Sequence, residues 1–169
     1  MMFEFGTFSK KEFPDGVDDF LESLAPFLKA LPDGFRYGVE IRNKDYLVPA
    51  YFNLLTRNKV AHVFNAWTRM PSLAEQIELQ GAFTTDLVAV RALLTKGRGY
   101  EQAVNAFEPY QEVKQPDPST REALRKIVDR TLKPRARAVL FVNNRLEGNA
   151  PGTIEAVVSP VGSVVKRAK

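Results

Sequence analysis

The stretch VAHVFNAWTRMPSLAEQI, residues 60–77, decides the class of fold. It begins with an almost wholly apolar run, residues 60–64, of the kind that forms a strand covered on both faces of a sheet. A polar loop follows, and Ser72 and Glu75 then form an S-x-x-E capping box, which predicts that a helix begins there. A buried strand that leads through a loop into a helix is the repeating unit of parallel α/β folds.

The same unit recurs along the whole chain. Strands are expected at residues 3–8, 37–41, 60–64, 87–93 and 138–142. Helices are expected from Asp15 to residues 32–34, at 46–57 behind Asp45, from Ser72 to Gly81, at 101–107, behind a second capping box of Ser119 and Glu122, and at 153–158. Alternation this regular implies right-handed crossovers and a parallel sheet.

Two architectures contain such a sheet, an open doubly wound sheet and part of a (β/α)₈ barrel. A doubly wound nucleotide-binding protein usually has a glycine-rich turn after its first strand. The turn here, Gly6-Thr7-Phe8, does not qualify, and the chain contains no P-loop. Composition alone does not decide between the two architectures.

The composition limits the chemistry. The chain has 169 residues, 44% of them hydrophobic and 26% charged, which suits one globular domain. It has no cysteine, which excludes disulfides, thiolate metal sites and a cysteine nucleophile. Its single histidine, His62, excludes sites that need two, such as H-E-x-x-H. Because His62 lies inside an apolar strand, we expect a hydrogen-bonded core residue.

The charge and the chain ends bear on location. The formal net charge is +4, and part of the excess lies in Lys166, Arg167 and Lys169. We therefore expect one domain over residues 1–160 and a solvated basic tail over 161–169. No apolar run approaches the roughly 20 residues of a membrane span, and the first residues lack the order of a signal peptide. A cytoplasmic protein without membrane contact is the expectation.

Polar residues end four of the five expected strands, and the carboxyl ends of parallel strands meet at one edge of a sheet, where functional groups gather. We predict Glu40 and Arg42 as catalytic residues, since side chains two apart in a strand share a face. The predicted substrate-binding residues are Asn65, Trp67, Arg69, Arg91, Tyr100, Asn143 and Asn144. Structural alternatives stay open: an ion pair of Glu40 with Arg42, a turn at residues 143–144, and a packing role for Trp67.

Four segments resemble the YecE-like family, a family of domains of unknown function. They are FRYGVEIRNKDY (35–46), VAHVFNAWTRMP (60–71), VAVRALLTKGRGYEQAV (88–104) and VLFVNNRLEGNAP (139–151). The family's strand ending in Glu-x-Arg corresponds to Glu40 and Arg42, and its Val-x-x-Arg strand to Arg91. Its late Asn-Asn followed by Gly and Ala-Pro corresponds to Asn143, Asn144, Gly148, Ala150 and Pro151.

The resemblance implies a TIM-barrel-like fold of which this chain supplies the C-terminal portion. The family's opening strands have no counterpart, so we expect a partial (β/α)₈ barrel with about five of the eight strands. Many family members have Arg-x-His-Gly where this chain has Arg91-Ala92-Leu93-Leu94, so no histidine is available there.

Three functions remain open from the sequence. The first is an enzyme that acts on a small polar or anionic metabolite, with Glu40 as acid, base or metal ligand and the arginines binding anionic oxygens. The second is a nucleic-acid-associated protein, favoured by the sequence pI near 9.4. The third is a non-catalytic remnant or interaction protein. No cofactor or metal can be assigned, although oxygen ligands could hold Mg²⁺ or Mn²⁺. Exposed sheet edges favour a homodimer or a partner that supplies the missing strands.

Overall fold

A single five-stranded parallel sheet organises the molecule. The structure is a computed structural model that describes residues 1–132, 134 and 136–165. The strands follow one another in chain order across the sheet and every neighbouring pair is parallel. They are β1 (Met2–Glu4), β2 (Gly38–Glu40), β3 (Ala61–Ala66), β4 (Leu87–Ala92) and β5 (Arg137–Val142).

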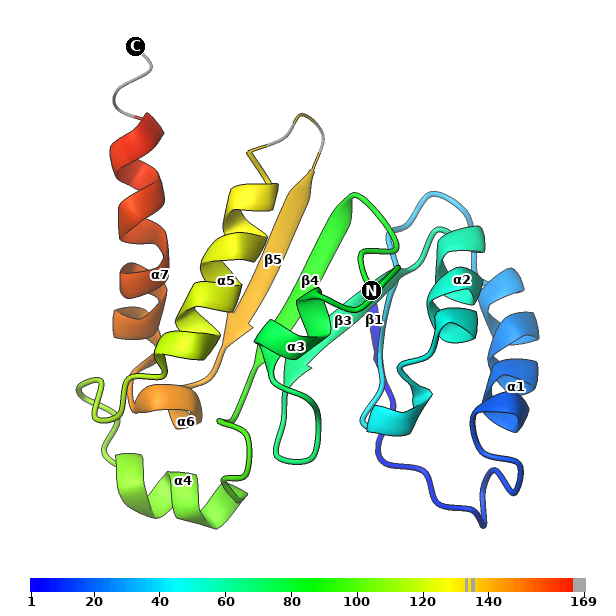
Figure 1. The fold of residues 1–169 in the computed structure, drawn as a ribbon, viewed down its shortest axis with the longest axis horizontal. Helices are drawn as coiled ribbons and strands as arrows, with labels where there is room; N and C mark the ends of the chain where they lie inside the picture. The colour runs from blue at the N-terminus through cyan, green and yellow to red at the C-terminus, as the bar shows by residue number, and fades with distance from the viewer. Residues whose placement is uncertain (133, 135, 166–169) are drawn as a thin grey trace.

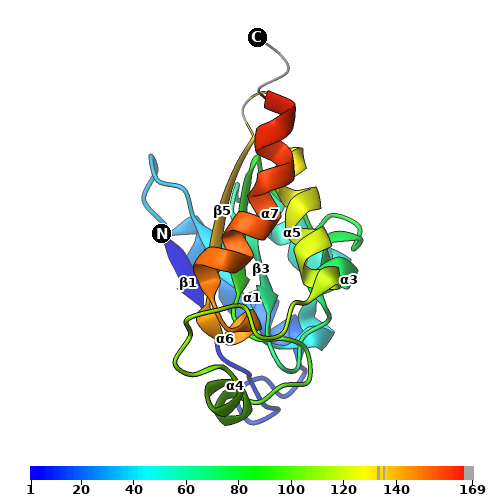
Figure 2. The same cartoon turned by 90° about the vertical axis from the view of Figure 1, so that its left-hand side faces the viewer.

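Helices alternate with the strands and most of them lie on one side of the sheet, whereas those at residues 100–107 and 144–147 lie beyond its lower end, as Figures 1 and 2 show. They are α1 (Val17–Lys29), the 3-10 helix η1 (Lys44–Tyr46), α2 (Pro49–Arg57), α3 (Leu73–Ile77), α4 (Tyr100–Phe107), α5 (Pro118–Arg130), α6 (Asn144–Glu147) and α7 (Ala150–Val165). The expected class, five parallel strands alternating with helices, is confirmed.

One apolar cluster joins the sheet to these helices. It contains Val39, Phe64 and Val90 from the strands and Phe20, Leu55 and Leu124 from α1, α2 and α5. These side chains are 3% exposed or less. Their burial supplies the main stabilisation of the domain, because apolar area removed from water contributes about 25 cal/mol per Å².

The middle of the other face of the sheet carries small and apolar residues. Val63, Ala89 and Val139 are direct neighbours in register on this face. Gly38 lies so close to β3 that a Cβ atom there would be 2.9 Å from Cγ2 of Val63. Toward β5 the face becomes open: Val139 is 43% exposed and Phe141 is 51% exposed.

The sheet is curved toward this second face. The Glu4 side chain on β1 contacts Arg91 on β4, although β2 and β3 lie between them. Three strand spacings amount to about 14 Å in a flat sheet. Curvature brings the two side chains together, as it does for the strands of a barrel. The open, curved sheet is that of an incomplete barrel.

Of the four expected helix caps, one is confirmed and three are wrong, those at Asp15, Asp45 and Ser119. The Ser72–Glu75 capping box is present as predicted, with Glu75 N–H donating to Ser72 Oγ. The second box is not, because Asp117 caps α5 by accepting from the N–H of Thr120, and Pro118 occupies the first helical position. Asp15 does not cap α1, which begins after Gly16 without a side-chain cap.

Other boundaries also differ from the expectation. Asp45 lies inside η1 rather than capping a helix at 46–57, since α2 begins only at Pro49. The first strand covers residues 2–4 rather than 3–8, and α3 ends at Ile77, before Gly81. Residues 161–165 belong to α7, which is longer than expected. The basic residues of the predicted tail, at 166, 167 and 169, lie outside the described residues.

Candidate functional site

The carboxyl ends of the strands lie at the end of the molecule that carries η1, α4 and α6 (Figure 1). Here this end is called the rim. Glu40 closes β2, Arg91 is the penultimate residue of β4, and Asn65 lies beside Arg91 in register. Asn143 follows β5 directly, and its N–H donates to the carbonyl of Ala92. The predicted polar residues therefore do gather at one end of the sheet.

Glu40 is the centre of an ion-pair cluster. Its side chain is fully buried, and each oxygen faces a different guanidinium group. Oε1 lies 3.3 Å from Nε of Arg42, and Oε2 lies 2.6 Å from a terminal nitrogen of Arg91. Burial lowers the pKa of Arg91, but bonds to the carboxylates of Glu40 and Glu4 outweigh it and hold that pKa above its usual value. The carboxylate of Glu40 holds both guanidinium groups in a fixed orientation.

Glu4 is a further member of this cluster that the sequence analysis missed. One of its oxygens contacts Arg42 and the other contacts Arg91, so its carboxylate bridges the two guanidinium groups. Its side chain is 40% exposed, in contrast to that of Glu40. No local signal in the sequence marks Glu4, because it reaches the cluster through the pairing of β1 with β2, where it lies opposite Glu40. We expected a strand at residues 3–8, which placed Glu4 near its beginning rather than at its carboxyl end.

Trp67 lies at the rim as a support for Arg42. The guanidinium carbon of Arg42 is 4.2 Å from the centre of the Trp67 ring, a cation–π contact. The Arg42 side chain is only 16% exposed. Stacking and two carboxylate partners together fix the plane of this guanidinium.

Asn65 contributes a buried polar atom without a partner. Its side chain is fully buried, and Nδ2 donates to the carbonyl of Ile41 at 3.0 Å. Gln76 holds the backbone of Asn65 on both sides, accepting from its N–H and donating to its carbonyl. Within the described part of the chain, Oδ1 of Asn65 accepts no hydrogen bond. Buried oxygens without a hydrogen-bond donor are uncommon in proteins, and a ligand or a water molecule often supplies the missing donor.

Two other predicted residues lie apart from the ion-pair cluster. Arg69 is exposed in the turn after β3. Tyr100 begins α4, is 53% exposed, and stacks with the guanidinium carbon of Arg145, 4.3 Å from its ring centre. A role for either residue in binding a substrate stays a prediction.

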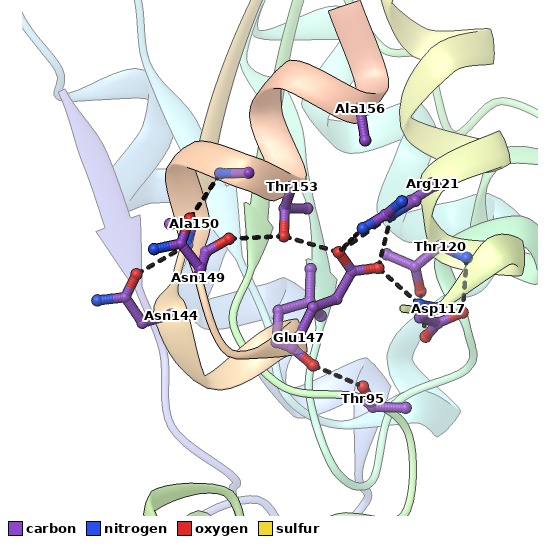
Figure 3. Close-up of polar contacts among 12 residues, drawn as sticks. Thr95, Asp117, Thr120, Arg121, Asn144, Glu147, Asn149, Ala150, Thr153 and Ala156 are labelled. Atoms are coloured by element: carbon purple, nitrogen blue, oxygen red, sulfur yellow. Dashed lines mark hydrogen bonds and ion pairs between the residues drawn. The ribbon is translucent and has the colours of Figure 1, made fainter. Parts of the chain in front are cut away.

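Asn143 and Asn144 use their side chains to begin helices. The Oδ1 atom of Asn143 accepts from the N–H of Arg145 and caps α6. The Oδ1 atom of Asn144 accepts from the N–H of Ala150 at 2.8 Å, at the start of α7 (Figure 3). The structure thus supports the turn role that the sequence left open for this pair, and their binding of a substrate stays a prediction.

Behind this pair lies a buried network that the sequence did not reveal (Figure 3). The fully buried carboxylate of Glu147 accepts from Arg121 on α5, from the hydroxyl of Thr153 on α7, and from the N–H of Asp117. Gly148 follows with φ +113°. Glu147 therefore connects α5, α6 and α7. Because its carboxylate is occupied by these partners, its role is structural.

His62 is a core residue, as expected. It is 2% exposed, and its Nδ1 lies 3.3 Å from the hydroxyl of Tyr51. Burial lowers the pKa of His62 to about 3, so the ring is neutral at physiological pH. Burial, assisted by the charge of Glu40, also raises the pKa of Tyr51 well above its usual value. The pair packs between the sheet and α2 and does not face the rim.

Clusters of metal-ligating side chains and membrane-spanning helices were sought in the part of the chain that the structure describes. Residues 1–132, 134 and 136–165 contain no group of three or more acidic or histidine side chains placed to hold a metal ion. None of the described helices combines the length and the apolar character needed to cross a membrane.

Comparisons with known proteins agree with this architecture. A family model described as "Protein of unknown function DUF72" matches residues 10–168, and DUF72 is the YecE-like family that the sequence resembles. Two solved structures of a DUF72 family protein from Enterococcus faecalis V583 are similar to this chain, with TM-scores of 0.57 and 0.53 at 14% and 17% identity. The matches cover 96% of this chain and 60% and 58% of those chains. No curated protein matches.

Proposed function

Since the chain belongs to the DUF72 family of proteins of unknown function, we propose that its rim binds a small ligand through a carboxylate or phosphate group held between Arg42 and Arg91. The observation that carries this proposal is the position of Glu4. Its carboxylate bridges the two guanidinium groups, one oxygen to each. A ligand carboxylate or phosphate would make the same two contacts, since arginine binds both groups through paired N–H donors.

The remaining residues of the rim fit such a ligand. Glu40 and the Trp67 ring hold the guanidinium groups in place before a ligand arrives, which reduces the cost of ordering them on binding. The Oδ1 atom of Asn65, which has no partner among the described residues, supplies an acceptor for a hydroxyl or amino group of the same ligand. Glu4 is displaced, because its exposed side chain on a three-residue edge strand is the member least held by packing.

The test is a calorimetric titration of the intact chain with inorganic phosphate and with a sugar phosphate. Glu4→Gln should bind these anions about tenfold more tightly than the native chain, because it removes the competing carboxylate. Glu101→Gln is the matched control, since it changes the net charge equally at an exposed position on α4. Equal affinities for Glu4→Gln and the native chain, or tighter binding by Glu101→Gln as well, would contradict the proposal.

A catalytic role for the same site is a second proposal. In it, Glu40 acts as acid, base or metal ligand, as the sequence suggested. Its ion pairs with two arginines give more support to the role of holding these arginines in place. The rim does not favour a polyanion, because two carboxylates neutralise its two central arginines.

We further propose that the protein forms a homodimer in the cytoplasm. The open sheet supports self-association, since β1 and β5 each have a strand on one side only within the described residues. Unpaired edges beside exposed apolar side chains favour pairing with another chain. A cytoplasmic location rests on the sequence and is tested by microscopy of a fluorescently tagged chain.

A further inference from the structure

The end of the sheet opposite the rim contains a cationic hollow. It has a volume of about 740 Å³ and lies where β4 and β5 begin and where α2 and α5 end. Its lining includes Arg36, Lys59, Arg130 and Arg137, against a single carboxylate, Asp86. In Figure 1 this end is the upper one, far from α4 and α6. The amino ends of barrel strands ordinarily serve stability rather than catalysis, so the concentration of charge has no explanation in the rim chemistry.

Among the described residues, no neighbouring side chain neutralises these four cations. Within residues 1–132, 134 and 136–165, none of them has a carboxylate oxygen within 4.0 Å or a side-chain hydrogen bond. Arg130 is held instead by its stacking on the ring of Phe83, with 3.9 Å from the guanidinium carbon to the ring centre. The contrast with the rim is clear, because Arg42 and Arg91 there are both paired with Glu4 and Glu40.

A second hollow extends the cationic surface. It has a volume of about 490 Å³, shares Tyr37 and Lys59 with the first, and adds Lys29 and Arg57. Asp33 is the one carboxylate in its lining. The Phe35 ring beside these cations is 69% exposed, so its face is accessible to a partner. Here the two hollows together are called the cationic surface.

The sequence that leads into β5 is also rich in cations. The segment RTLKPRAR, residues 130–137, contains four cations and no acid. Two of its cations, at 133 and 135, lie outside the described residues, and the cationic surface is defined without them.

From this geometry we infer that the cationic surface binds single-stranded nucleic acid. Unneutralised cations spread over two adjoining hollows fit a chain of phosphates better than one phosphate group. The Phe35 ring, which is 69% exposed and lies against the buried Tyr37 ring with 6.3 Å between the ring centres, offers the kind of stacking surface that single-stranded bases use. Stacking distinguishes this partner from an anionic membrane, which needs only the charge. The inference is independent of the anion site at the rim.

The test measures the fluorescence anisotropy of a labelled single-stranded oligonucleotide about 20 nucleotides long, with the intact chain, over a series of salt concentrations. The native chain should bind, and Arg130→Gln/Arg137→Gln should weaken binding about tenfold. The slope of log affinity against log salt should fall by about 1.4 for this variant, roughly 0.7 for each lost phosphate contact. Arg36→Gln/Lys59→Gln, which leaves the Phe83 stack intact, should behave in the same way. Phe35→Ala should weaken binding without changing the salt slope.

The matched control is Lys10→Gln/Lys44→Gln, which removes two exposed cations near the rim and has the same net charge as the other double variants. Its affinity should stay close to the native value. The inference would be overturned if the native chain did not bind, or if all three double variants weakened binding equally. Full displacement of the oligonucleotide by an equimolar amount of pyrophosphate would show a site for a small anion instead. Tight binding to phosphatidylserine vesicles without binding to the oligonucleotide would show a membrane surface.

Discussion

Glu4 and Glu40 bind the same two arginines but lie in different surroundings. Glu40 is fully buried, whereas the Glu4 side chain is 40% exposed. Removing one partner from a buried ion pair leaves an uncompensated charge, while an exposed pair is screened by water. The two carboxylates therefore have separate tasks: Glu40 holds the arginines in place and Glu4 occupies the position that we assign to a ligand.

Substitution separates these tasks. Glu40→Gln should lower the free energy of unfolding by about 3–5 kcal/mol, because it leaves two guanidinium groups beside a neutral amide. Glu4→Gln is the matched control and should cost at most about 1 kcal/mol, since water screens its contacts. Urea denaturation followed by circular dichroism measures both values. Equal costs for the two variants would contradict the difference in burial on which the proposed roles rest.

His62 gives the stability a pH dependence. Its pKa is about 3 in the folded chain and near 6.5 when unfolded, so the unfolded chain binds more protons between these values. The free energy of unfolding is therefore highest above about pH 6.5, where the ring is neutral in both states. It falls by about 1.4 kcal/mol for each pH unit as the pH drops toward 3.

The measurement is the urea midpoint at several pH values between 4 and 7, a range that spans about two to three units below the unfolded pKa. His62→Phe is the control, because it keeps an aromatic ring in the core and removes the titrating group. The slope of the unfolding free energy against pH gives the number of protons taken up on unfolding, and this number should differ between the two chains by nearly one. Parallel pH profiles for the native chain and His62→Phe would show that the ring is not held neutral by burial.

At the scale of elements, the loop between β5 and α7 shows which patterns can be interpreted from sequence. The Asn-Asn pair was expected to bind a substrate or to turn the chain, and its amide oxygens begin α6 and α7. Gly148 has φ +113°, and a Cβ atom there would lie 2.7 Å from the carbonyl oxygen of Glu112. The motif therefore has a structural task, which is to bring Glu147 into contact with Arg121.

Two glycine substitutions test this explanation. Gly97 also has a positive φ, +83°, but nothing lies within 4 Å of its Cβ position. Gly97→Ala should therefore cost only the backbone strain, about 1 kcal/mol. Gly148→Ala should cost at least about 2 kcal/mol more, because the new methyl group also meets backbone atoms. Thermal unfolding measures the stability of the two variants. Equal losses of stability would mean that the loop at residues 112–114 can move away from residue 148 at little cost.

The same elements show why some boundaries were predictable and others were not. The capping box at Ser72 is a local pattern with one interpretation, and it is present. The second box failed because Asp117 stands before a proline, and that combination caps a helix better than Ser119 inside it. Glu4 was missed because β1 is held in the sheet by pairing with β2, a contact between residues 36 positions apart that no local pattern encodes.

At the scale of the whole molecule, the choice of a partial barrel rested on the family resemblance, whereas the strand alternation of the sequence was sufficient for the parallel α/β class. It was also sufficient to place Glu40, Asn65 and Arg91 at one end, since parallel strands share their carboxyl ends. The cationic surface was not predictable, because its charges come from three separate helix-to-strand junctions, α1–β2, α2–β3 and α5–β5, that only the folded chain brings together.

The open face of the sheet leads to a prediction about assembly. If a second copy covers it, Val139→Lys should shift a dimer toward the monomer, since a charge at this 43% exposed position on β5 opposes apolar contact. Ile154→Lys on α7 is the matched control, because Ile154 is also 43% exposed but lies on the helical side. Light scattering of dilute samples gives the masses. A native chain that is monomeric, with the amides of β1 and β5 protected from exchange, would refute the dimer.

The most direct measurement for the central claim, an anion site between Arg42 and Arg91, is a crystal structure of Glu4→Gln grown with a sugar phosphate. The account predicts electron density for the phosphate group within hydrogen-bond distance of both guanidinium groups, with Glu40 still bound behind them. The sugar hydroxyls should reach Oδ1 of Asn65. Arginines that remain closed on Glu40, with no anion between them while phosphate is bound elsewhere on the chain, would contradict the account.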